Sequence, residues 1–510
     1  MIRIYFDGRP VWAREGATVL DAAKAAGIRI PHLCRHASLP PEGSCRICLV
    51  AVEGLPKLEL ACSTVVREEM KIATSSPSVR EARRAVLELL LTEHPLDCPI
   101  CDKAGECKLQ NYAHEYGLTA GPFAEEQLRR DKLVPLGAGL ILDRERCVLC
   151  TRCVRFLAAI TGTRELGLFE RGVRAEIGLY DDRPVASVDA GNLVDLCPVG
   201  AITDARFRFR TRPWFLEARP TICPFCARGC AMDADFHPGF ARRPESSGIF
   251  RFRPRVNPEI NGWWLCDRGR HESMGLVKNR LHGGREAADW KRLIADLAER
   301  LREMKTTGKQ KEIAVLLSSR LTAEELFLAS ALFRAGLGVE RFAFLDPREG
   351  AAEGLLLRPD RSANARGADR LGFDRSVDPA AAVTGSSLLI ALAADPAGIA
   401  AWREPGVALA AIRTKILIAP QPTGLEEAFD LVLPSAGVFE KSGTFVSEGD
   451  RVQAFEPVHP PCPDVRSESW ILASLGTALD LDAAVFSRPD DPSFAAAAMR
   501  AAHPDLGGGR

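Results

Sequence analysis

The 510-residue sequence lacks several features that would place it in common classes of protein. It has no uninterrupted apolar run of the roughly 18–20 residues that a membrane-spanning helix needs, so we expect any membrane connection to pass through partner proteins. Its 67 basic and 67 acidic residues cancel, which gives no overall case for binding nucleic acid or an anionic membrane. The phosphate-binding patterns G-x-G-x-x-G and G-x4-G-K-S/T are also absent, so a nucleotide site has no support in the sequence.

An export signal is missing as well. Residues 2–6 alternate like a first strand and lack the apolar core of a signal peptide. Disulfide frameworks belong to small domains in oxidising compartments. We therefore interpret the grouped cysteines as reduced and metal-bound. Fifteen of the sixteen cysteines fall in the first 266 residues, in groups of four, three, four and four, and only Cys462 stands apart.

Residues 1–77 have the pattern of a small α+β unit of the β-grasp, ferredoxin-like type. Residues 2–6 are predicted as a strand, and residues 17–26 as a helix that ends at Gly27. The cysteines that follow parallel the plant-type ferredoxin pattern C-x4-C-x2-C, with a longer first gap. This pattern favours a 2Fe–2S site, with structural zinc as the alternative. The candidate ligands are Cys34, Cys45, Cys48 and Cys62.

The second ligand set follows a predicted helix. Ser78 and Glu81 form a capping-box pattern at its start, and Pro95 ends it. The pattern H-x3-C-x2-C-x5-C comes next, and we expect it to hold a 4Fe–4S cluster near the middle of an electron relay. A neutral imidazole in place of a thiolate removes one negative charge, which should raise the reduction potential. Cys3His zinc sites use the same ligand types, so zinc is the alternative. The candidate ligands are His94, Cys98, Cys101 and Cys107.

The third set has the spacing C-x2-C-x2-C with a distant Cys-Pro. This spacing is typical of a 4Fe–4S cluster, whereas structural zinc usually binds two separated cysteine pairs. We therefore predict a second 4Fe–4S site. Its candidate ligands are Cys147, Cys150, Cys153 and Cys197.

A fourth set, C-x2-C-x3-C with one later cysteine, again favours a 4Fe–4S cluster. Its candidate ligands are Cys223, Cys226, Cys230 and Cys266. The surrounding residues 206–255 contain eleven arginines and four acidic residues. Arginines interleaved with phenylalanines could form a nucleic-acid patch. We prefer a second interpretation, in which guanidinium groups offset the negative charge of thiolate-bound clusters and bind carboxylates of neighbouring subunits.

From about residue 288 the pattern changes to alternating helices and strands. An amphipathic helix begins at Trp290, and another is predicted over residues 322–335. This alternation predicts a parallel, doubly wound α/β sheet. Residues 350–385, rich in Arg, Ala, Gly and Asp, are predicted as a long loop or partly mobile insertion. The predicted strands are residues 313–317, 342–345, 388–392 and 416–418.

The order of these ligand sets resembles the large iron–sulfur subunit, of the G type, of bacterial respiratory complex I, the NADH–quinone oxidoreductase. The resemblance covers residues 1 to about 275 and is reinforced by Cys-Val-Leu-Cys-Thr-Arg-Cys-Val-Arg-Phe at residues 147–156 and by residues 191–201. It implies one 2Fe–2S cluster on the first set and a 4Fe–4S cluster on each of the other three.

The remainder resembles a shortened molybdopterin-oxidoreductase-like domain. Residues 430–434 and 440–453 match its late strand-and-loop motif. After Cys266 only Cys462 is present, too late to serve as the ligand of a metal-bound pterin, so we expect no molybdopterin. Together these features predict five domains, three small iron–sulfur domains, a molybdopterin-oxidoreductase-type 4Fe–4S domain and the α/β domain. Their ranges are 1–77, 78–117, 118–215, 216–275 and 276–510.

The resemblance implies an electron-relay subunit with no catalytic residues or substrate site of its own. Electrons would arrive from the flavin of an NADH-oxidising partner and leave toward the iron–sulfur subunits of a quinone-reducing module. The protein would then act as an enzyme only as part of a proton-translocating NADH dehydrogenase, in the peripheral arm on the cytoplasmic side of the bacterial inner membrane. The alternatives are an iron–sulfur subunit of a soluble NAD-linked hydrogenase or a formate dehydrogenase, and a zinc-bearing interaction scaffold. An iron-only hydrogenase would need further cysteines downstream, and only Cys462 is there.

Overall fold

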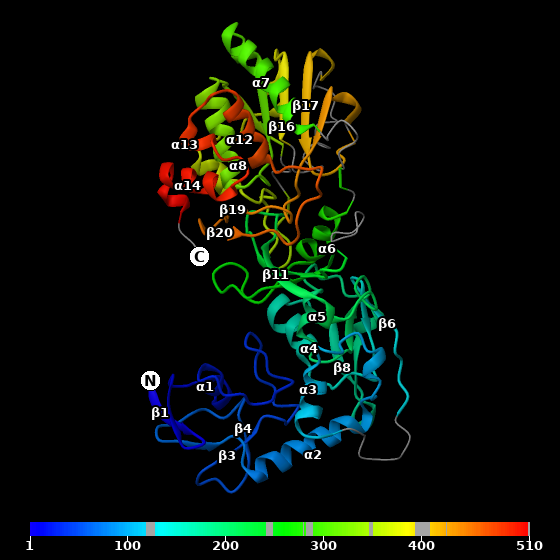
Figure 1. Ribbon diagram of the computed structural model, residues 1–510. Helices are drawn as coiled ribbons and strands as arrows, with labels where there is room; N and C mark the ends of the chain where they lie inside the picture. The colour runs from blue at the N-terminus through cyan, green and yellow to red at the C-terminus, as the bar shows by residue number, and fades with distance from the viewer. Residues whose placement is uncertain are drawn as a thin grey trace. The chain divides into compact units, whose positions relative to one another are not determined.

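The computed structural model describes residues 1–118, 128–240, 248–278, 280–281, 289–345, 350–392, 409–424 and 426–507. The chain divides into two compact units, Met1–Phe215 and Leu216–Arg510 (Figure 1). Within the described part of the chain, none of the helices has the length and apolar character needed to cross a membrane.

A five-stranded mixed sheet opens the first unit. Its strand order is β2-β1-β5-β3-β4, in which β1 and β5 are parallel and the other neighbours antiparallel. Helix α1 begins after Thr18, whose hydroxyl accepts a hydrogen bond from the Asp21 amide, and is followed by Gly27 at φ +70°, which confirms the predicted helix. One apolar core contains α1 and the sheet, including Ile4 and Leu20. The elements are β1 (Ile2–Phe6), β2 (Arg9–Ala13), α1 (Val19–Ala25), β3 (Leu49–Val52), β4 (Glu59–Leu60) and β5 (Lys71–Ala73).

Helix α2 (Pro77–Glu93) starts earlier than the capping pattern predicts. Its cap is Ser76, whose hydroxyl accepts a hydrogen bond from the Val79 amide at 3.4 Å. The predicted cap at Ser78 is therefore wrong. Pro77 takes the first helical position, where a missing N–H costs nothing, and so fixes the start of the helix. The helix ends at His94, before Pro95 as predicted.

The rest of the first unit consists of short helices and strands joined by loops. Strands β10, β7 and β6 form one small sheet, and β8 and β9 form a hairpin. Helix α4 continues into a π-helical turn over Leu157–Thr161. The elements are α3 (Lys108–Glu115), β6 (Val134–Gly137), β7 (Leu140–Leu142), α4 (Arg152–Phe156), β8 (Leu166–Phe169), β9 (Glu176–Leu179), α5 (Asn192–Leu196) and β10 (Ile202–Asp204).

The second unit begins with a three-stranded antiparallel sheet of β11 (Glu217–Ile222), β12 (Ala231–Phe236) and β13 (Ile249–Pro254). Helix α6 (Asp267–Leu276) packs against β13. Two arginines of β13 bind the buried carboxylate of Asp235 on β12, Arg251 at 2.6 Å and Arg253 at 2.7 Å. Part of the arginine-rich stretch thus neutralises a carboxylate of its own chain.

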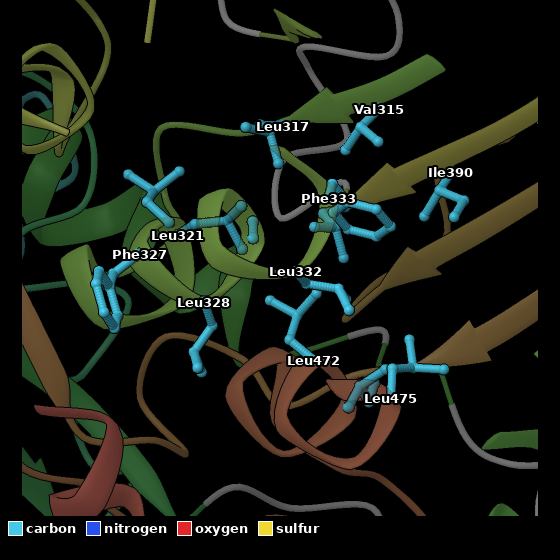
Figure 2. Packing of buried hydrophobic residues seen from close by; sticks show 14 of the residues in the cluster. Val315, Leu317, Leu321, Phe327, Leu328, Leu332, Phe333, Ile390, Leu472 and Leu475 are labelled. Atoms are coloured by element: carbon cyan, nitrogen blue, oxygen red, sulfur yellow. The ribbon is translucent and has the colours of Figure 1, made fainter. Parts of the chain in front are cut away.

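A five-stranded parallel sheet forms the centre of the second unit, with the order β15-β14-β16-β17-β18. This sheet confirms the predicted parallel strands and adds β18. Apolar side chains alternate between its two faces, so that Leu317 belongs to one core and Leu316 to another. Figure 2 shows Leu332 facing Leu472 of α12 on the first of these faces. The strands are β14 (Ile313–Leu317), β15 (Arg341–Phe344), β16 (Leu388–Leu392), β17 (Thr414–Ala419) and β18 (Leu431–Pro434).

Helices cover both faces of this parallel sheet. The predicted helix at Trp290 is confirmed, and Thr322 caps α8 with a capping box to Glu325. The chain of α8 then runs on as a π-helical turn, Ser330–Gly336. The remaining elements are α7 (Trp290–Thr306), α8 (Ala323–Ala329), α9 (Ala365–Arg370), α10 (Pro379–Val383), β19 (Gly443–Val446), β20 (Val452–Phe455), α12 (Glu468–Ala478), α13 (Ala483–Phe486) and α14 (Pro492–Ala502).

The segment 350–385 differs from its prediction as a long loop or mobile insertion. It contains α9 and α10, and Asn364 within it is fully buried. The Asn364 side chain donates to the Leu321 carbonyl at 3.0 Å and accepts from the Val446 amide at 2.8 Å. The prediction was wrong for these helices because each is shorter than two turns and too short to show a helical period.

Candidate iron–sulfur sites

The first ligand set lies in the loop between α1 and β3 and just after β4. All four thiols are buried, and the Cys34 thiol is hydrogen-bonded to the thiols of Cys45 and Cys62. The Cys48 thiol is hydrogen-bonded to Cys62 as well. The Cys34 amide also donates to the Cys45 sulfur at 3.4 Å. The fold therefore brings together the four residues that sequence spacing selected.

The second set lies between the end of α2 and the start of α3. His94 ends α2, and Cys107 is the residue before α3. Burial lowers the pKa of His94 to about 4, so its imidazole is neutral at pH 7, which is the form that binds metal. The ring donates a hydrogen bond to the backbone carbonyl of Arg146, which orients it. Burial raises the pKa of the Cys107 thiol to about 11 and also raises the pKa of Cys101.

Arg146 contacts the second set, although the sequence did not single it out. Its buried guanidinium binds both oxygens of Asp97, at 3.1 and 2.6 Å, between the candidate ligands His94 and Cys98. Lys132 lies 3.6 Å from the same carboxylate. Although burial raises the pKa of Asp97, the hydrogen bond and charge of Arg146 outweigh it and hold the pKa below its usual value. One residue thus fixes the loop through its side chain and the His94 ring through its carbonyl.

The third set lines one small cavity together with Leu142, Ile177 and other apolar side chains. Burial raises the pKa of Cys147 to about 12 and of Cys150 to about 11, and it raises that of Cys153 further. Four thiols converge there from three places in the fold, namely the loop after β7, helix α4 and the end of α5, as Cys147, Cys150, Cys153 and Cys197.

The loops between ligands have the backbone shape that suits an iron–sulfur cluster. Leu149 and Thr151 have φ values of +46° and +53°, which is unusual for residues with a side chain. The amides of Leu149 and Arg152 point at the sulfurs of Cys147 and Cys150. Such concave backbone turns bind anions and iron–sulfur clusters. Buried thiolates also need a bound cation to remain charged, so this donor set fits a cluster.

In the first unit, residues next to the third set contact residues of both earlier sets. The amide of Lys108, next to Cys107, donates to the carbonyl of Pro198, next to Cys197, at 3.2 Å. Arg155 on α4 donates to the carbonyls of both Cys34 and Cys150. The third set therefore contacts both the first and the second, although it comes after both along the chain.

The fourth set belongs to the second unit, between β11 and β12 and at the start of α6. The Cys223 amide donates to the Cys230 carbonyl at 2.9 Å, and Cys266 caps α6 by accepting from the Gly269 amide at 3.4 Å. A Cβ at Gly269 would lie 2.9 Å from the Cys223 sulfur and 3.6 Å from the Cys266 sulfur, so the two thiols face the same glycine. Burial raises the pKa of Cys223 and Cys226.

A second arginine that the sequence did not single out, Arg320, contacts this fourth set. Its Nε donates to the Pro224 carbonyl at 3.1 Å, and its guanidinium lies 4.8 Å from the centre of the Phe225 ring. Arg320 follows strand β14 and is 96 positions from Pro224, so no local spacing connects it with this loop. Across the described residues, which include all the candidate ligands, no group of three or more His, Cys, Asp or Glu side chains has the geometry of a single-ion site.

Comparison with known families agrees with this series of sites. Residues 1–77 match a 2Fe-2S iron-sulfur cluster binding domain, and residues 83–121 an NADH-ubiquinone oxidoreductase-G iron-sulfur binding region. Residues 137–203 match the ferredoxin-like domain of NADH-quinone oxidoreductase subunit 3. Residues 416–478, which include β17, β18 and β19, match the molybdopterin oxidoreductase family.

Individual relatives connect these regions in one protein. The G-type subunit of the NADH-quinone oxidoreductase of Streptomyces coelicolor is 35% identical over 458 residues, which is 86% of this chain and 52% of the relative. The chain is a homologue of the G-type subunits of NADH-quinone oxidoreductases. The corresponding Mycobacterium tuberculosis protein is 42% identical over 53% of this chain and 33% of the relative. Subunit 3 of the Thermus thermophilus oxidoreductase is 36% identical over 66% of this chain and 46% of the relative.

The chain spans about half the length, or less, of these three relatives. One chain of the crystal structure of an NAD+-reducing NiFe-hydrogenase is 32% identical and is covered over 91% of its length, against 42% of this chain. Its TM-score of 0.39 is too low to support an argument.

Proposed function

We propose that this chain is an electron-relay subunit of an NADH–quinone oxidoreductase. The observation that carries the proposal is the third set, whose four thiols line one small cavity, together with similarity to the G-type subunits over 86% of the chain. When bound there, iron–sulfur clusters would supply one-electron chemistry at potentials tuned by ligand type, burial and charge. The residues themselves bury most of the thiols, aim backbone amides at sulfur and keep His94 neutral.

The proposal assigns one 2Fe–2S cluster and three 4Fe–4S clusters. The ligands would be Cys34, Cys45, Cys48 and Cys62; His94, Cys98, Cys101 and Cys107; Cys147, Cys150, Cys153 and Cys197; and Cys223, Cys226, Cys230 and Cys266. The five predicted domains, with their β-grasp and ferredoxin-like folds, belong to the same proposal. It includes no molybdopterin, since Cys462 is the only cysteine after the fourth set.

The partners would be the other subunits of such an oxidoreductase. Electrons would come from the flavin of an NADH-oxidising subunit and continue to the iron–sulfur subunits of a quinone module. The chain would then lie in the peripheral arm of a membrane complex, on the cytoplasmic side of the bacterial inner membrane. No substrate site on the chain itself is part of the proposal.

Metal analysis combined with paramagnetic resonance tests the proposal. We expect the anaerobically purified complex to contain iron and acid-labile sulfide for one 2Fe–2S and three 4Fe–4S clusters, with resonance signals after dithionite reduction. The variant Cys150→Ser should lose one 4Fe–4S signal, because it removes a buried thiol of the third set. Cys462→Ser, which changes the cysteine outside the sets, should lose none. Zinc in place of iron and sulfide would refute the relay and favour a zinc scaffold.

A further inference from the structure

Helix α4 carries two arginines that neither the proposed ligands nor the relay account for. Arg152 and Arg155 are three positions apart, so they project from the same side of the helix. Arg152 is 3% exposed, and the Arg155 side chain is 11% exposed. Burying a guanidinium is costly unless its donors are bound, so their partners indicate what the arginines do.

Arg155 joins the loops of two different sites. Its Nη2 donates to the carbonyl of Cys34 at 2.6 Å and to the carbonyl of Cys150 at 3.0 Å. Its Nη1 donates to the carbonyl of Pro40 at 2.5 Å, and its Nε donates to the Thr151 hydroxyl at 3.2 Å. A single nitrogen of Arg155 is thus bonded to the peptides of two proposed ligands, one in the first set and one in the third.

Arg152 makes a second connection beside the first. Its Nη2 donates to the carbonyl of Arg35, next to Cys34, at 2.6 Å, and its Nη1 donates to the carbonyl of Leu196, next to Cys197, at 3.0 Å. Its charge acts on the sulfurs of Cys150, Cys197 and Cys34. Two guanidinium groups therefore lie between the first and third sites, each bonded to both sides, and Arg155 is also ion-paired with the half-exposed Glu42 at 3.8 Å.

We propose that Arg155, supported by Arg152, is a positioning residue that couples the 2Fe–2S site to the third site during electron transfer. This inference rests on the proposed function. The bridge provides a continuous path from the Cys34 sulfur through its own backbone, the Arg155 Nη2 and the Cys150 backbone to the Cys150 sulfur. With clusters held at both sites, one-electron exchange would oxidise one and reduce the other, with no proton moved and no covalent bond made or broken. Under the proposed function, the flavin of the partner would supply the electron.

Two consequences follow from the geometry. The bridging guanidinium holds the two ligand loops at a fixed separation, so its loss should slow electron transfer between them. Its positive charge also stabilises the reduced form of each site, which is the more negative one, so its loss should lower both reduction potentials. A lysine would keep the charge, but its single flexible ammonium cannot form the same set of hydrogen bonds as a planar guanidinium bonded to several carbonyls. The two variants Arg155→Lys and Arg155→Gln therefore separate the effects of geometry and charge.

The test uses the intact complex with wild-type chain, Arg155→Lys, Arg155→Gln and the control Arg183→Gln. Arg183 is an exposed arginine that is ion-paired to Asp181 at 3.3 Å, away from the ligand loops. Redox titration followed by paramagnetic resonance gives both potentials, and rapid freezing after mixing with NADH gives the transfer rate between the two sites. Iron and sulfide analysis of every sample shows whether the sites are loaded.

We expect Arg155→Gln to lower the equilibrium constant for reduction of both sites about tenfold. This corresponds to a fall of about 59 mV in each one-electron reduction potential. Both Arg155 variants should slow transfer between the sites, while Arg155→Lys leaves the potentials near those of the wild type and Arg183→Gln changes neither property. Loaded variants with wild-type potentials and rates would overturn the bridge and leave the relay intact. Equal loss of clusters from both Arg155 variants, with wild-type potentials in whatever clusters remain, would overturn it in favour of a structural cross-link. A wild-type chain without iron and sulfide would overturn the relay itself.

Discussion

At the scale of single residues, the second set differs from the other three by one imidazole. The structure gives His94 two properties that ligation needs, a neutral ring and a fixed orientation through the carbonyl of Arg146. Its role as a ligand stays a prediction, because the ring could serve the fold alone. A substitution that changes the charge at the site distinguishes the two roles.

The variant His94→Cys should lower the reduction potential of the second site and slow quinone reduction, with the cluster still assembled. A thiolate adds one negative charge where a neutral ring was, and this disfavours the reduced state. Redox titration monitored by paramagnetic resonance measures the potential. His114→Cys, at an exposed position on α3, is the matched control and should leave it unchanged. An unaltered potential in His94→Cys would remove His94 from the ligands.

At the scale of secondary-structure elements, the start of α2 carries two different sequence signals for a helix cap. Two serines, Ser76 and Ser78, stand at its start, and the capping-box pattern favours the second. The hydrogen bond to the Val79 amide comes from the first. The deciding residue is Pro77, which is suited to the first helical position, so the sequence did contain a signal for the correct cap.

Replacing Ser76 by alanine should destabilise the first turn of α2 by about 1 kcal/mol, the usual cost of losing a helix cap. The amides of that turn should then exchange about fivefold faster with solvent deuterium. Ser78→Ala is the matched control. Its hydroxyl contacts that of Ser76 at 3.1 Å and should have a smaller effect. If Ser78→Ala caused the larger change, the cap would lie at Ser78 after all.

At the scale of the whole molecule, the ligand sets follow the division into two units. The first three sets lie in residues 1–215 and the fourth in residues 216–510. None of the proposed sites takes ligands from both units. Each unit also has its own apolar core, the first around Ile4 and Leu20 and the second on the parallel sheet.

We therefore expect the two units to assemble their clusters independently when they are expressed separately. Residues 1–215 should bind a 2Fe–2S and two 4Fe–4S clusters, and residues 216–510 one 4Fe–4S cluster, as measured by iron analysis and paramagnetic resonance. A break between residues 190 and 191 is the control, because it separates Cys197 from Cys147 and should abolish the third cluster. A first unit that lost its third cluster without that break would contradict the assignment.

Much of the candidate site could be predicted because iron–sulfur ligand spacing is local. The triplets at Cys147 and Cys223 place three sulfurs within a few residues, and the chain between them has few ways to turn. The parallel sheet was predictable for a similar reason, since buried strands such as Ile313–Leu317 are continuous apolar runs. Short helices such as α9 and α10 carried no such signal.

The sequence by itself determined the types and spacing of the candidate ligands, since both depend on neighbours along the chain. Only the tertiary structure decided that the third set contacts the first, because Arg155 bonds to the peptides of Cys34 and Cys150. Cys34 is more than a hundred positions from the other two residues. Their contact depends on how separate elements pack, which no spacing in the sequence records.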